Sequence, residues 1–150
     1  MIQRKQSLYL LLAAGIQTYF AFGTYFKYTA DGMTFSLTGS GTINFENEQI
    51  QGNDKTLILS LIVAALAVVS IFIFKKRKQQ QKITKIGVLF TFVEMIFLVM
   101  SYLNIQDLNP TSISFGIPIF VLPISTVLFF LAGKAIKKDD DLIKSVDRIR

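Results

Sequence analysis

The sequence predicts an all-α membrane protein: a four-helix transmembrane bundle with both termini cytoplasmic and a small β-hairpin in the first outer loop. Three observations support this prediction. Hydrophobic residues make up 51% of the 150 residues, four apolar runs are long enough to cross a bilayer, and the positive charges gather on one side of these runs. We treat residues 1–150 as a single transmembrane domain.

Each apolar run has the length of a single membrane crossing. An α-helix rises about 1.5 Å per residue, so roughly 18 residues span the hydrocarbon core of a bilayer, which is about 30 Å thick. The third run contains one acidic residue, Glu94. The expected spans are Leu8–Phe26, Leu57–Phe74, Ile86–Leu103 and Phe115–Gly133.

The distribution of positive charges predicts the orientation of these spans. Fourteen of the sixteen Lys and Arg residues lie before the first run, between the second and third, or after the fourth. Lys27 and Lys55 alone lie in or beside the outer part of the chain, the loop 27–56. The positive-inside rule therefore places both termini in the cytoplasm. The basic stretch "KKRKQQQK" joins two spans and has no aromatic residues, so we expect it to lie beside anionic lipid and expect no nucleic-acid partner.

The absence of two residue types narrows the possible chemistry. The chain contains no cysteine and no histidine. Thiol catalysis and disulfides are therefore excluded, and zinc and most transition-metal sites are disfavoured. We expect no catalytic residue, no metal and no cofactor.

The outer loop contains a segment, "TFSLTGSGTINFE", that alternates apolar and polar residues with the period of a β-strand. Folding it at Gly39–Gly41 sets Leu37 opposite Ile43 and Phe35 opposite Phe45, which predicts a hairpin with one apolar face. That face either caps the bundle, which we favour, or is a docking surface for a periplasmic partner.

The end of the chain, residues 134–150, is predicted to be a separate amphipathic helix. Asp139 or Asp140 would cap its N-terminus, which we favour over a divalent-cation site in the same acidic run. The helix either lies on the inner leaflet or docks on another protein. Its apolar face would consist of Leu142, Ile143, Val146 and Ile149.

Glu94 raises the question of what a carboxyl does inside an apolar run. It lies halfway along its span, and the residues at the same depth in the first and last spans are Gln17 and Ser125 with Thr126. We expect these four side chains to form a polar cluster at the bilayer midplane, with Glu94 protonated because desolvation disfavours its charged form. A hydrogen-bonded structural contact is the favoured role; a proton or cation site is the alternative.

Both ends of the chain resemble a known family. The start "MIQRKQSLYLLLA", the loop "FKKRKQ" and the end "LAGKAIKKDDDLIKSVDRIR" are similar to the family known as domain of unknown function 4293, small four-span membrane proteins of Bacteroidota. The resemblance extends over essentially the whole chain. It implies a bacterial inner-membrane protein, and it implies no activity, cofactor or catalytic residue.

Two functional hypotheses follow. We favour a non-catalytic small inner-membrane protein, an accessory subunit or assembly factor of a larger membrane complex, because the chain has no nucleophile with a base and no phosphate-binding loop. Its partners would be the lipid bilayer and other inner-membrane proteins. The alternative is a small oligomeric transporter or proton-handling protein that uses Glu94. The chain shows no internal repeat of the kind common in transporters.

Overall fold

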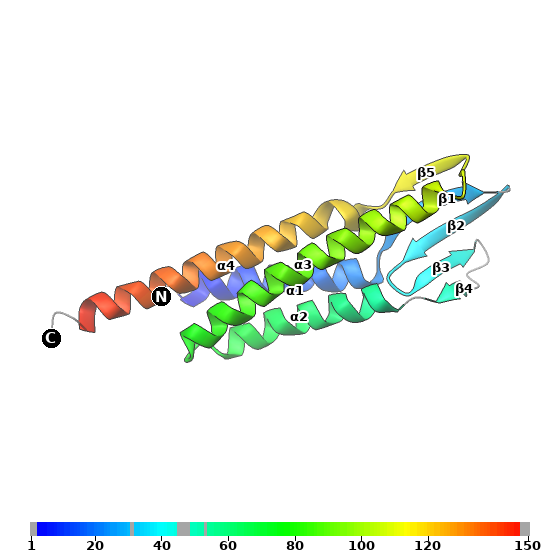
Figure 1. The fold of residues 1–150 in the computed structure, drawn as a ribbon. Coiled ribbons are helices and arrows are strands. Elements are labelled where there is room, and N and C mark those ends of the chain that lie inside the picture. The colour runs from blue at the N-terminus through cyan, green and yellow to red at the C-terminus, as the bar shows by residue number, and fades with distance from the viewer. Residues whose placement is uncertain (1–2, 31, 45–48, 53, 148–150) are drawn as a thin grey trace.

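The structure, a computed structural model, describes residues 3–30, 32–44, 49–52 and 54–147. In this part of the chain four helices lie side by side, and five strands form a sheet at one end of them (Figure 1). The elements are α1 (Gln3–Phe22), β1 (Thr24–Ala30), β2 (Met33–Thr38), β3 (Gly41–Asn44), β4 (Gln49–Gly52), α2 (Lys55–Phe72), α3 (Arg77–Gln106), β5 (Ser112–Phe115) and α4 (Ile117–Asp147).

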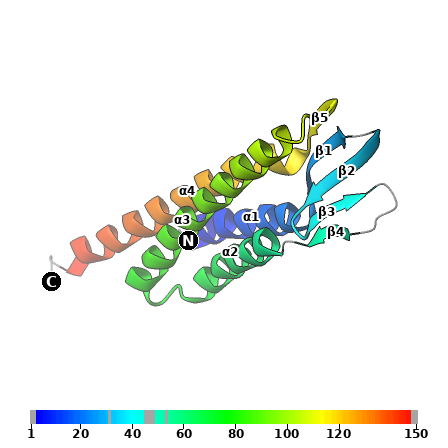
Figure 2. The ribbon, with the colours of Figure 1, turned by 45° about the vertical axis from the view of Figure 1, so that its right-hand side comes forward.

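The sheet shows that the prediction of an all-α fold with one hairpin is wrong. Its strands are antiparallel in the order β4-β3-β2-β1-β5. The edge strand β5 comes from the connection between α3 and α4 and lies beside β1 (Figure 2). In this pair of strands Phe26 lies opposite Phe115. Segments far apart in the sequence thus build one sheet.

The number of expected spans is also corrected. Within the described residues, three helical segments are long and apolar enough to cross a membrane: Lys55–Phe72, Arg77–Gln106 and Ile117–Ser145. The helix α1 packs between α2 and α4 but is less apolar, because it opens with Gln3–Gln6 and contains Gln17. It also ends at Phe22, four residues before the predicted boundary at Phe26.

The early end of α1 follows from the sequence after Phe22. Gly23 lies against α4, where a Cβ atom would stand 2.3 Å from the ring of Pro118. The next residues are threonine and aromatic, which favour an extended strand. A register shift between Thr24 and Phe26 accompanies the burial of both Tyr25 and Phe26. A bulge at this point lets two neighbouring aromatic side chains turn toward the helices.

The sheet covers one end of the helical bundle. Tyr25 stacks on Phe20 of α1 with ring centroids 4.6 Å apart, and both side chains are buried. These aromatic residues share an apolar cluster with Leu98 and Ile105 of α3 and Leu122 of α4. The sheet is therefore packed onto the bundle by the hydrophobic effect.

The β2–β3 hairpin forms, with a register that differs by one residue from the prediction. Leu37 lies opposite Thr42 and Ser36 lies opposite Ile43, so the turn has two residues rather than three. Neighbouring strand residues point to opposite faces, and this slip moves Ile43 to the face opposite Leu37. The expected partner of Phe35, Phe45, lies outside the described residues; Asn44 is opposite Phe35 instead.

The predicted helix at residues 134–150 does not begin on its own in the described part of the chain, where residues 134–147 belong to α4. The last span continues without a break to Asp147, and α4 extends beyond the other helices at the end opposite the sheet (Figure 1). Phe129, Ala132, Ile136 and Asp139 follow one another at helical spacing, and all four are buried. The inward face of α4 therefore continues past the predicted end of the span, so Asp139 does not cap a helix.

Candidate functional site

Each of the four helices contributes one buried polar residue at the same level of the bundle. Gln17 of α1, Ser60 of α2, Glu94 of α3 and Ser125 of α4 all have an exposed fraction of 0%. We call these four residues the polar layer. The complete burial of Glu94 is unusual, because acidic side chains are almost never fully buried without a partner.

Gln17 is the centre of the hydrogen bonding in the polar layer. Its Nε2 donates to Oε2 of Glu94 at 3.0 Å and to Oγ of Ser125 at 3.1 Å. An amide nitrogen carries two hydrogens, so both are used. This one side chain therefore joins α1 to α3 and to α4.

Some hydrogen-bonding atoms of the polar layer have no partner among the described residues. Ser60 lies beside the Glu94 carboxyl and donates a hydrogen bond of 2.7 Å to the carbonyl of Thr56. Within the described part of the chain, Oε1 of Glu94 and Oε1 of Gln17 have no hydrogen-bond partner. No ion pair to Glu94 is found among the same residues. Each of these two oxygens can still accept a hydrogen bond, and Oε1 of Glu94 can carry a proton.

The polar layer separates two apolar clusters. On the sheet side lie Phe20 and Leu122, and on the other side lie Leu10, Val63 and Phe129. The second cluster is closely packed, because Phe129 rests on Gly87 of α3, where a Cβ atom would stand 2.6 Å from the ring. Apolar packing above and below therefore encloses the layer.

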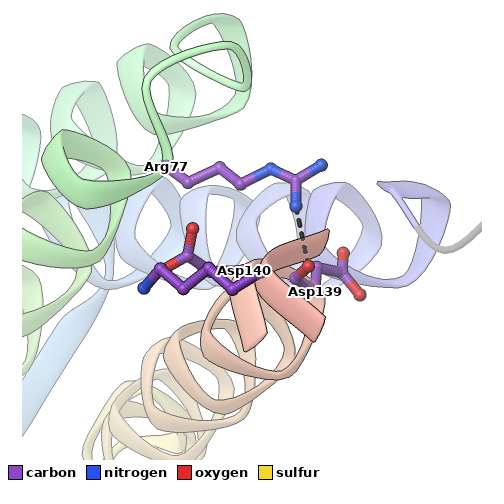
Figure 3. A network of polar contacts seen from close by, with 4 residues as sticks. Arg77, Asp139 and Asp140 are labelled. Carbon is purple, nitrogen blue, oxygen red and sulfur yellow. Dashed lines mark hydrogen bonds and ion pairs between the residues drawn. The ribbon is translucent and has the colours of Figure 1, made fainter. Parts of the chain in front are cut away.

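A second buried polar group lies at the opposite end of the bundle from the sheet. Gln6 of α1 donates a hydrogen bond to Asp139 of α4, and both side chains are buried. Arg77, at the start of α3, donates to the backbone carbonyl of Asp139 at 2.8 Å (Figure 3). The neighbouring Asp140 pairs with Lys144 at 2.5 Å. These contacts join α1, α3 and α4 where α4 leaves the bundle.

The structure brings together three of the four residues predicted to form the midplane polar cluster. Depth along the helices points to Gln17, Glu94, Ser125 and Thr126, and the structure brings the first three together. Thr126 lies next to them and donates to Thr91 of α3 at 3.0 Å. That separate hydrogen bond adds a second link between α3 and α4.

Sequence reasoning missed Ser60, Gln6 and Asp139. Ser60 lies near the start of α2, so counting from the middle of that span selects alanines instead. A signal was present, since Ser60, Val63, Ala67 and Ser70 follow one face at helical spacing and are all buried. Gln6 and Asp139 gave no comparable signal, because polar residues near the ends of spans are usually solvated.

The predicted contact residues fall into three groups. Phe35, Leu37 and Ile43 of the sheet are partly buried. Leu142 and Ile143 are exposed on the part of α4 that extends beyond the bundle. Phe45, Ile149 and the side chain of Val146 lie outside the described residues.

These features define a class: a membrane protein with three candidate spanning helices, a buried polar layer across its bundle and a sheet packed on one end. The chain belongs to the family described as Domain of unknown function (DUF4293), whose model matches residues 2–149. No curated protein and no solved structure matches the chain.

Proposed function

We propose that this protein is a non-catalytic small membrane protein that acts by binding, as an accessory subunit or assembly factor of a larger membrane complex. The observation that carries the proposal is the complete enclosure of Glu94, which has an exposed fraction of 0%. A carboxyl group that serves ion transport must be accessible to its ion, whereas the Glu94 carboxyl group accepts a hydrogen bond from the amide of Gln17. The polar layer is best explained as a structural contact between helices.

Two surfaces at opposite ends of the molecule are available for binding. At the sheet end, Met33 and Phe115 are more than half exposed. At the other end, Leu142 and Ile143 are nearly half exposed on the extension of α4. Apolar side chains outside the bundle, on both ends, fit a protein that contacts partners rather than a self-contained unit.

The location that we propose is the inner membrane of a bacterium, with the sheet outside. The basic turn Lys75–Lys78, the start of α1 and the end of α4 all lie at the end of the bundle opposite the sheet (Figure 1). The positive-inside rule favours the cytoplasm for this end. The start of α1 and the end of α4 would then both face the cytoplasm.

The test is affinity purification of a tagged chromosomal copy in a mild detergent, followed by quantitative mass spectrometry. We expect one larger membrane complex to co-purify in fixed stoichiometry. The variant Leu142→Asp/Ile143→Asp should lose this complex, and the matched variant Gln79→Asp/Lys82→Asp, at exposed positions of α3, should retain it. Recovery of the protein only as copies of itself would contradict the proposal.

The second candidate is proton handling at Glu94, and a specific observation favours it. A cavity of about 20 Å³, enough for one water molecule, lies between Tyr25, Thr38, Thr56 and Ser101 on the sheet side of the polar layer. Ser60 donates to the carbonyl of Thr56 and lies beside the Glu94 carboxyl. Burial raises the pKa of Tyr25, whose hydroxyl has no partner among the described residues.

These groups form a discontinuous polar route from the sheet toward Glu94. Proton flux into liposomes that contain the purified protein tests whether the route is used. Proton handling predicts a flux that Glu94→Gln abolishes while the protein still folds. A flux equal to that of empty liposomes would exclude this candidate.

A further inference from the structure

A groove between α3 and α4 combines positive charge with an apolar floor. It has a volume of about 410 Å³, within the usual range of ligand sites. Three lysines surround it, Lys85 of α3 and Lys134 and Lys137 of α4, and the aromatic ring of Phe130 and the side chain of Val88 form part of its wall. We call it the lysine groove. No acidic residue in the described part of the chain lines it.

The lysine groove has more positive than negative charge around it. Among the residues that the structure describes, none of the three ammonium groups takes part in an ion pair. Lys134 instead lies over the ring of Phe130, with Nζ 4.5 Å from the centroid. Lys134 and Lys137 also line a neighbouring cavity with Asp141, which forms no ion pair with either lysine. Three lysines against one neighbouring aspartate leave the lysine groove with a net positive charge beside an exposed aromatic surface.

Its depth matches the headgroup region of a bilayer. Lys85 precedes Glu94 by nine residues, and Lys134 follows Ser125 by nine residues. At the helical rise, both lysines lie about 14 Å from the polar layer along the bundle. Half of the hydrocarbon core is roughly 15 Å thick, so a polar layer at the midplane puts the lysines at the level of lipid phosphates. Val88 and Phe130 lie one turn deeper, at the level of acyl chains.

The absence of a side chain at Gly133 helps to keep the groove open. Gly133 lines it, and a Cβ atom there would stand 3.3 Å from Oγ1 of Thr84. A larger side chain at Gly133 would therefore occupy space between the two helices without changing any charge.

From these observations we infer that the lysine groove is a binding site for an anionic phospholipid of the leaflet at the end of the bundle opposite the sheet. The phosphate would lie among Lys85, Lys134 and Lys137, and an acyl chain would follow Val88 and Phe130 toward the midplane. Basic pockets between transmembrane helices on the cytoplasmic side bind anionic lipid headgroups by this combination of contacts. A zwitterionic lipid would lack the net negative charge that the three lysines complement.

Native mass spectrometry of the purified full-length protein tests the inference. The protein is mixed in detergent with phosphatidylglycerol or with phosphatidylcholine that has the same acyl chains. We expect the protein to retain phosphatidylglycerol at least tenfold better than phosphatidylcholine. The variant Lys85→Gln/Lys134→Gln/Lys137→Gln should lose this preference, since each lysine contributes to the attraction of an anionic headgroup.

Two further variants distinguish lipid binding in the groove from attraction by net charge and from an effect of misfolding. Lys75→Gln/Lys76→Gln/Lys78→Gln removes the same number of charges from the basic turn and should keep the tenfold preference. Gly133→Leu fills the groove and should lose bound phosphatidylglycerol while the circular dichroism spectrum stays that of the wild type.

Three results would contradict the inference that the lysine groove binds an anionic lipid. One is equal retention of phosphatidylglycerol by the wild type and by the groove lysine variant. The second is an equal loss in both lysine variants, which would mean that net charge alone attracts the lipid. The third is displacement of phosphatidylglycerol by an equal concentration of inorganic phosphate, which would mean that the groove binds a free anion rather than a lipid.

Discussion

Nε2 of Gln17 on α1 lies 3.0 Å from Oε2 of Glu94 on α3, although 77 residues separate the two in the chain. Because both side chains are fully enclosed, water cannot replace either partner. The contact therefore contributes both to the stability of the bundle and to the relative positions of the two helices.

Substitution of Glu94 separates a structural contact from a proton site. Glu94→Gln keeps an oxygen that accepts from Gln17, so we expect thermal stability in detergent close to that of the wild type. Glu94→Leu removes the acceptor and should reduce the free energy of unfolding by about 1 kcal/mol. Circular dichroism melting curves measure both variants. A stable Glu94→Gln protein that no longer binds its partner complex would argue that the proton matters.

The packing of Phe129 on Gly87 predicts a position that tolerates no side chain. In Gly87→Ala the new Cβ would stand 2.6 Å from a buried ring, so we expect a loss of about 1–3 kcal/mol from overpacking. Gly15→Ala is the matched control, because nothing lies within 4 Å of its Cβ, and it should be neutral or stabilising. Adding Phe129→Leu to Gly87→Ala should restore part of the loss. Equal effects of the two alanine substitutions would contradict this packing.

The register of the β2–β3 hairpin can be tested with engineered disulfides, since the natural chain has no cysteine. Leu37 lies directly opposite Thr42, so Leu37→Cys/Thr42→Cys should form a disulfide under mild oxidation. Leu37→Cys/Ile43→Cys places the two thiols on opposite faces and should remain reduced. Intact-mass measurement before and after oxidation distinguishes the two results. The reverse outcome would favour the three-residue turn.

The buried pair of Gln6 and Asp139 predicts a coupled effect on stability. Asp139→Leu leaves the buried amide of Gln6 without its acceptor, so we expect a loss of about 1–3 kcal/mol. Asp141→Leu, at an exposed position, should change stability by less than about 0.5 kcal/mol. The double variant Gln6→Leu/Asp139→Leu removes both polar partners and should be more stable than Asp139→Leu alone. Additive losses from the two single substitutions would show that the contact contributes nothing.

The proposed orientation predicts which positions a membrane-impermeant maleimide reaches in spheroplasts. Single cysteines at Thr34, Gln79 and Ser145 are suited to this test, since all three positions are exposed. Gln79 suits the test better than the adjacent Gln80, which is buried and donates to the carbonyl of Ser70 at 2.9 Å. Only the cysteine at Thr34 should react before the membrane is permeabilised. Labelling of intact spheroplasts at Gln79 or Ser145 would reverse the orientation.

The sequence by itself determined the class of this protein and the depth of its polar residues. Long apolar runs indicate a membrane protein because the thickness of a bilayer sets the length of a spanning helix. Depth is also countable, because residues rise along a helix at a constant rate, and it brings Gln17, Glu94 and Ser125 to one level. Terminal motifs were sufficient to indicate the family whose model matches residues 2–149.

Only the tertiary structure decided the sheet, the register of its hairpin and the course of α4. The pairing of Phe26 with Phe115 depends on α3 and α4 bringing β5 beside β1, and local periodicity contains no information about such a distant partner. Residues 134–147 continue α4 because Ile136 and Asp139 are buried in the bundle, whereas a sequence pattern shows only an amphipathic segment. Contacts between segments far apart in the chain therefore determined what the spacing of residues left open.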